Sequence, residues 1–200
     1  MPFTSYATDY ALNQWAANHG LYMSLHSAYS LTGANELSGG TYARVPVTWG
    51  SASGGVISLA STPYAMNAPA SSTVGWIGFW DASTSGNFQG MWPNAATASA
   101  YAFSVPSSTG VFLAPGSAYA ATQPVVLFPT GGSALPSGVS AGTVYYALSP
   151  SSDSFELSAT SGGSPLTLTS DGSGYAQAIT LETFGSAGVF DVSSFSITQV

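Results

Sequence analysis

Residues 21–27 read Leu-Tyr-Met-Ser-Leu-His-Ser, and this short run indicates the fold class of the chain. Apolar side chains occupy every second position from Leu21 to Leu25, with other residues between them. A period of two is typical of a β-strand that buries one face. Residues 42–49 repeat the pattern. Pro46 within them indicates an edge strand or a bulge, because proline has no N–H to donate to a neighbouring strand.

Residues 4–20, just before this run, carry a helix signal. Ser5 is a candidate N-cap, and Asp9 is expected near the positive N-terminal end of the helix. An apolar stripe that includes Leu12 and Trp15 follows, and Gly20 is a typical stop after the last turn. We therefore expect one short amphipathic helix at the N-terminus.

Short apolar runs continue to the C-terminus, separated by turns rich in Gly, Pro and Ser. Their spacing is that of a sandwich or barrel. The expected strands are 56–60, 74–80, 88–92, 125–128, 143–148, 154–158, 165–169 and 176–181. Residues 93–108 are expected to form a linker or a long crossover, and Asp171–Gly174 a turn. A last run, 189–197, fits as a returning strand in either half.

These patterns predict a mostly β protein of two domains. Residues 1–108 are expected to form a β-sandwich or barrel-like domain with the one short helix, and residues 109–200 a smaller β-rich module. No internal repeat is strong.

Composition excludes several functional classes. Only 4% of the 200 residues are charged, against about 25% in ordinary domains. One arginine and no lysine cannot form the basic cluster that binds nucleic-acid phosphates. Without cysteine there is no disulfide or thiolate metal site. Because 45% of the residues are hydrophobic, we expect a folded chain. No apolar run has the length of a membrane span, and the N-terminus lacks a signal-peptide pattern.

The motifs of common enzymes are missing. The chain has no Gly-x-Ser-x-Gly elbow, although His19 and His26 are candidate bases for one of its many serines. The eight acids are scattered and offer no evident glycosidase pair. A calcium loop needs several carboxylate ligands, but the glycine-rich turn at Asp171 has only this one. We therefore predict no catalytic residue, no metal and no cofactor.

Arg44 and the tryptophans are the residues that merit separate attention. As the only strong cation, Arg44 is expected to form a structural ion pair with Glu36 or Asp81, and a ligand contact is the alternative. The tryptophans are expected mainly in the core, because each buries a large apolar area. Trp80 and Trp92 are kept as candidate surface contacts, as in a sugar-stacking platform.

Several motifs in the first ninety residues resemble small tail-fibre-like minor tail proteins of tailed bacteriophages, especially those of actinobacterial hosts. The motifs are Ser24-Leu25-His26, Thr32-Gly33-Ala34-Asn35-Glu36-Leu37-Ser38-Gly39-Gly40, Tyr42-Ala43-Arg44, Thr48-Trp49, Gly78-Phe79-Trp80-Asp81-Ala82 and Gly86-Asn87-Phe88. Residues 121–182 resemble a β-rich module of phage virion proteins. Such proteins often have an Asp-Pro turn after the histidine, where this chain has Ser27-Ala28-Tyr29-Ser30.

The resemblance implies a non-enzymatic structural protein of the virion, synthesised in the host bacterial cytoplasm, with no catalytic residues to carry over. Its expected partners are other virion proteins and copies of itself, most simply as a trimer. Two alternatives stay open, a capsid decoration protein and a carbohydrate-binding module for host surface glycans. No nucleic acid and no membrane span are expected.

Overall fold

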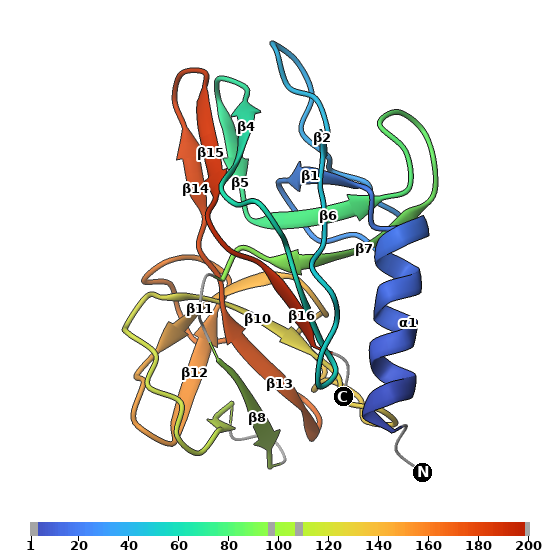
Figure 1. Ribbon diagram of the computed structural model, residues 1–200. Coiled ribbons are helices and arrows are strands. Elements are labelled where there is room, and N and C mark those ends of the chain that lie inside the picture. Colours follow the sequence, from blue (N-terminus) through green and yellow to red (C-terminus); the bar gives the residue numbers. More distant parts are fainter. Residues whose placement is uncertain (1–3, 96–98, 107–109, 199–200) are drawn as a thin grey trace. The chain divides into compact units, whose positions relative to one another are not determined.

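The computed structural model describes residues 4–95, 99–106 and 110–198. It confirms the mostly β class with one helix near the N-terminus (Figure 1). Contacts along the chain group it into two compact units, Met1–Trp92 with Glu182–Val200, and Pro93–Leu181. The predicted domain boundary between residues 108 and 109 lies outside the described residues, so that boundary stays a prediction.

The first unit contains the helix and one four-stranded antiparallel sheet. Its elements up to the end of this sheet are α1 (Ser5–Asn18), β1 (Tyr22–His26), β2 (Val45–Pro46), β3 (Val56–Ser58), β4 (Tyr64–Ala68), β5 (Ser72–Val74), β6 (Trp76–Trp80) and β7 (Phe88–Pro93). The strand order in the sheet is β2-β1-β6-β7. Pro46 therefore lies in an edge strand, one of the two positions expected for it. Strand β1 is buried on both faces, not one, since Ser24 and His26 are as inaccessible as Met23 and Leu25.

The N-cap of helix α1 is Thr4, one residue before the expected cap, Ser5. Thr4 has extended backbone angles, and its hydroxyl accepts a hydrogen bond from the Ala7 N–H at 3.3 Å. Asp9 lies beyond the first turn, and its carboxylate accepts hydrogen bonds from the N–H groups of Gly54 and Gly55 at 3.2 and 2.7 Å. The acid thus fixes a loop to the helix, in place of the expected role at the helix end.

The C-terminal run returns to the first unit. It forms β14 (Glu182–Phe184), β15 (Gly188–Val192) and β16 (Ser196–Thr198), which pair with β5, β4 and β3 in two-stranded sheets (Figure 1). Phe190 and Val192 enter the same core as Met23, Leu25 and Phe79. The sequence had left either half open as the destination of this run, because its apolar pattern suits any sheet.

The second unit is a closed six-stranded barrel. Its strands are β8 (Ala100–Val105), β9 (Phe112–Leu113), β10 (Pro124–Phe128), β11 (Val144–Leu148), β12 (Ser154–Ser158) and β13 (Gly172–Ala178), in the order β10-β11-β12-β9-β8-β13. Its core holds the stacked rings of Phe112 and Phe155, 5.1 Å apart, which Tyr119 and Phe103 contact edge-on. A closed barrel thus occurs in the second half, whereas the sequence placed the barrel-like domain in the first.

Three local predictions in the second unit were wrong. Strand β8 forms where a linker or crossover was expected, and residues 165–169 form no strand, although Leu168 is buried. The predicted turn Asp171–Gly174 instead begins strand β13. An added Cβ at Gly174 would collide with the carbonyl oxygen of Phe128, so this strand needs glycine for close backbone approach and not for a turn.

We predict that residues 93–181 fold alone, whereas residues 109–200 do not. Fragment 93–181 contains every strand of the barrel. Fragment 109–200 lacks β8, and with it the pairing of β8 to β13 from Val105–Gly172 to Ala100–Gln177. Circular dichroism and cooperative thermal unfolding of the two fragments provide the measurement. A folded 109–200 fragment beside an unfolded 93–181 fragment would contradict this and favour the boundary expected from the sequence.

Candidate functional site

The side chain of Arg44 forms the centre of a polar network in the first unit. Its Nε donates to Oε1 of Glu36 at 2.9 Å, and its Nη2 donates to Oε2 at 2.8 Å. The side chains of Arg44 and Glu36 are only 10% and 19% exposed. The pair is thus bidentate and mostly removed from water, the geometry in which an arginine–carboxylate contact is strongest.

The remaining surfaces of the guanidinium are also occupied. Nη1 donates to the carbonyl oxygens of Ala82 and Ser85, at 3.0 and 2.7 Å. Cζ lies 3.5 Å from the centroid of the Trp80 ring, which places the cation over the π face. Lysine cannot reproduce this set, because it has neither a planar fork nor a flat face to stack.

Tyr42 connects this ion pair to the central sheet. Its hydroxyl donates to Oε1 of Glu36 at 3.1 Å and accepts from the backbone N–H of Leu25 in β1 at 3.0 Å. Burial raises the pKa of Tyr42 well above its usual range, and the neighbouring Glu36 carboxylate adds to this. The phenol therefore stays neutral and serves as a fixed donor.

A second chain of hydrogen bonds continues behind the Trp80 ring. Trp80 Nε1 donates to Ser24 Oγ at 3.0 Å, Ser24 Oγ lies 2.7 Å from His26 Nε2, and His26 Nδ1 lies 3.0 Å from the Ala34 carbonyl oxygen. A carbonyl only accepts, so Nδ1 carries the proton. In the neutral imidazole Nε2 then accepts from the Ser24 hydroxyl, and every group in the chain is satisfied.

Burial is the main reason for the neutral state of His26. Desolvation lowers the pKa of His26 below 6.5, against the opposing effects of the Ala34 hydrogen bond and of Glu36. Gly78 on β6 lies directly against this pair. A Cβ there would stand 2.5 Å from His26 Nε2 and 2.8 Å from Ser24 Oγ, so only glycine leaves room for the network.

Asp81, the other acid considered for Arg44, contacts Asn87 instead. Its Oδ1 accepts from the Asn87 N–H and its Oδ2 from the Asn87 side-chain amide, each at 2.7 Å. The side-chain hydrogen bond, with the backbone one, lowers the pKa of Asp81. These bonds close the turn that presents the Ala82 and Ser85 carbonyls to Arg44. Asp81 thus acts on Arg44 through a turn, an arrangement that residue types alone did not indicate.

The two tryptophans kept as candidate surface contacts differ in burial, since Trp80 is buried and Trp92 is half-buried. Trp80 is 8% exposed, and its faces and N–H are used by the network. Trp92 is partly buried against Trp15, Phe79 and Phe195, with ring centroids 5.7 to 6.5 Å apart. For Trp80, burial of the apolar ring in the core leaves little surface for a sugar, whereas a surface contact through Trp92 stays a prediction.

The network offers no evident reaction chemistry. The Ser24–His26 pair has the spacing of an activated nucleophile, but both residues are fully buried and the serine oxygen already binds Trp80. In the described part of the chain, no three His, Asp or Glu side chains gather as metal ligands. Over the same residues, no helix has the length and hydropathy to cross a membrane.

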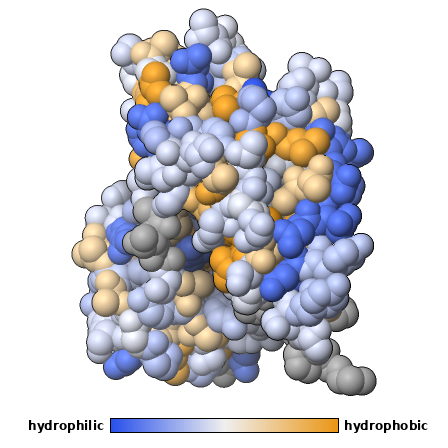
Figure 2. Space-filling view, in the orientation of Figure 1, coloured by the Kyte–Doolittle hydropathy of each residue, from blue (hydrophilic) through white to orange (hydrophobic). Residues whose placement is uncertain are grey.

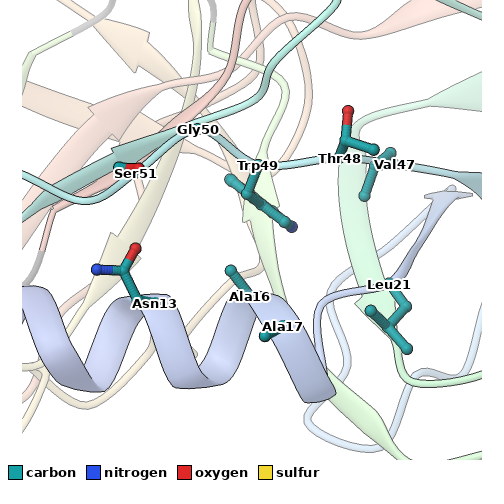
Figure 3. A pocket seen from close by; sticks show the side chains of 9 residues that line it. All are labelled: Asn13, Ala16, Ala17, Leu21, Val47, Thr48, Trp49, Gly50 and Ser51. Carbon is teal, nitrogen blue, oxygen red and sulfur yellow. The ribbon is translucent and has the colours of Figure 1, made fainter.

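A shallow groove of about 420 Å³ lies beside helix α1 (Figure 3). Asn13, Ala16 and Ala17 form its helical wall, and the extended segment 47–51 with Trp49 forms the opposite wall. The indole Nε1 of Trp49 donates to the Gly20 carbonyl oxygen at 2.7 Å, which fixes the ring. No sequence pattern indicates this groove, because its walls come from a helix and a loop thirty residues apart.

Comparison with known proteins finds a similarity to a phage fibre family. Residues 8–102, slightly less than half of the chain, match the family described as podophage GP4 fiber I protein gp80. No curated protein and no solved structure matches the chain. The match supports a phage fibre-like protein, in agreement with the coarser part of the resemblance seen in the sequence. The actinobacterial host and the virion module in residues 121–182 stay predictions.

We predict that Arg44→Met lowers the free energy of unfolding of the first unit by about 3–5 kcal/mol, because it leaves the Glu36 carboxylate uncompensated in a poorly hydrated site. Arg44→Lys should fall between this variant and the wild type. Chemical denaturation followed by tryptophan fluorescence is the measurement, and Glu182→Gln, an exposed acid in β14, is the control. Equal stabilities of wild type and Arg44→Met would show that the network is dispensable.

We also predict that the protein loses stability as the pH falls below 6.5. The unfolded chain protonates His26 near pH 6.5, but the folded chain does so only at lower pH. Between the two pKa values the unfolded state binds more protons, and the free energy of unfolding falls with a slope of up to about 1.4 kcal/mol per pH unit. Unfolding curves from pH 7.5 to 5 provide the measurement. The same slope in His26→Gln would contradict the assignment.

Proposed function

We propose that this protein is a non-enzymatic structural component of a bacteriophage virion, and specifically a minor tail or tail-fibre protein. The observation that carries the proposal is the match of residues 8–102 to a fibre protein family. This segment includes helix α1 from its second turn onward, the four-stranded sheet and every residue of the Arg44 network.

The chemistry of the network supports a structural role. Arg44, the only strong cation of the chain, binds Glu36, two carbonyl groups and an indole ring, and all of these partners lie within the first unit. The chain has few other charges to desolvate when surfaces come together. Uncharged, polar and aromatic surfaces suit lasting contacts between virion proteins, because burial of ions opposes association.

The proposed setting follows from this role. The protein is made in the cytoplasm of a bacterial host and resides in the virion, where it acts in particle assembly or in contact with the host surface. Its partners are other virion proteins and copies of itself, as a trimer, with a host surface glycan as a further ligand.

Purified virions test this proposal. We expect quantitative mass spectrometry to find a handful of copies per particle, and labelled-antibody electron microscopy to place them on the tail. Hundreds of copies with label on the heads alone would overturn the tail assignment in favour of a capsid decoration protein. Absence of the protein from virions would overturn the proposal as a whole.

A further inference from the structure

Helix α1 uses only part of its surface inside its own unit. Leu12 is the one fully buried residue of the helix, and Trp15 packs edge-on against Trp49 and Phe79. On another side, Tyr6 is 80% exposed and Tyr10 is 59% exposed. Two large aromatic side chains one turn apart are thus exposed to water. A partner surface that covered them would lower the free energy by burying their apolar area.

These tyrosines continue a stripe that reaches the groove. Tyr6, Tyr10, Asn13 and Ala17 follow one another at spacings of four, three and four residues, which places them on one helix face. The last two of them line the groove. A projecting aromatic pair and a recess therefore share one face, spread over about 16 Å of helix.

This face is also free of unpaired charge. None of the nine residues that line the groove is charged. The one acid of α1, Asp9, is held by the Gly54 and Gly55 N–H groups. Figure 2 shows the surface over α1 as mostly blue to white, polar without a large apolar patch. The formal charge of −7 opposes contact between copies in general, but this face contributes little to that repulsion.

We propose that this face, defined by Tyr6, Tyr10 and the groove between α1 and residues 47–51, binds a second copy of the chain. Tyr6 and Tyr10 of one copy pack into the groove of another, against Ala16, Ala17 and the Trp49 ring. A recess of about 420 Å³ is large enough to receive aromatic side chains. Because projection and recess lie on the same chain, each copy can fill the groove of a neighbour, in a twofold pair or in a closed ring such as a trimer.

The proposal rests on the proposed function, since a fibre is built from copies, and it names the surface that joins them. The competing occupant is a neutral saccharide, which would also find aromatic and amide groups here. The observations favour a second copy, because the exposed tyrosines project from the helix beside the groove, where they can fill the groove of a neighbour.

Absence of cysteine makes cross-linking a direct test. Two single-cysteine forms of the full chain that keep both tyrosines are mixed and treated with a short bismaleimide: Gln14→Cys, at an exposed position one turn from Tyr10, and Ser51→Cys. We expect the mixed cross-link at a yield at least tenfold above that of the matched pair Ala11→Cys with Ser51→Cys. Ala11 is exposed on the same helix but turned by about 100° from Tyr10. Equal or absent yields would overturn the proposal.

The molar mass in solution gives an independent readout. We expect light scattering to show a wild-type oligomer that dissociates on Tyr6→Glu with Tyr10→Glu, but not on Ala11→Glu. Glutamate in the first turns suits the helix dipole, and unchanged circular dichroism would show that α1 remains folded. A monomeric wild type, or an oligomer that the double variant leaves intact, would overturn the proposal.

Two outcomes separate this inference from the proposed function. A protein that is found on phage tails but keeps its oligomer in the double variant refutes the surface alone. Nuclear magnetic resonance shifts at Tyr10 and Trp49 on adding a neutral oligosaccharide to a monomeric protein would assign the groove to a glycan and overturn the copy-to-copy contact.

Discussion

The need to satisfy one buried guanidinium organises the first unit. Arg44 has five N–H donors in a rigid plane, and four of them find acceptors on Glu36, Ala82 and Ser85 while Trp80 covers one face. These partners come from two separate segments of the chain, at residue 36 and at residues 80–85. Since an unmet donor or an unpaired charge in this setting is costly, the loop at Glu36, the end of β6 and the turn after it are held in one arrangement.

The same constraint explains why the phage-like motifs are spaced as they are. Ser24 and His26 form the polar chain behind the Trp80 ring, and Gly78 leaves room for them. Tyr42 ties Glu36 to β1, and Asp81 with Asn87 shapes the turn beneath Arg44. Residues from almost every motif of the first ninety positions therefore take part in one network that holds the strands and loops of the first unit together.

A chain so poor in charge uses hydrogen bonds to backbone groups where other proteins use ion pairs. Asp9 holds a loop through two backbone N–H groups, and Tyr119 in the barrel donates to the Ala176 carbonyl oxygen at 2.8 Å. Such contacts fix loops without placing charge on the surface. The face of α1 that carries Tyr6 and Tyr10 likewise has no unpaired charge, which suits it to contact with a second copy of the chain.

The sequence by itself determined the mostly β class, the N-terminal helix, most strand positions and the importance of Arg44. These features depend on local periodicity, capping and composition, which can be read from residues close together in the sequence. Tertiary structure alone decided that β14, β15 and β16 return to the first unit, since their apolar pattern fits any sheet. It also decided that Glu36, not Asp81, receives Arg44, and that Trp80 is buried. It converted the glycine-rich run at Gly172 into a strand and built a groove from α1 and residues 47–51. Each of these features depends on which segments, distant in the sequence, pack against one another, and composition and residue spacing do not determine that packing.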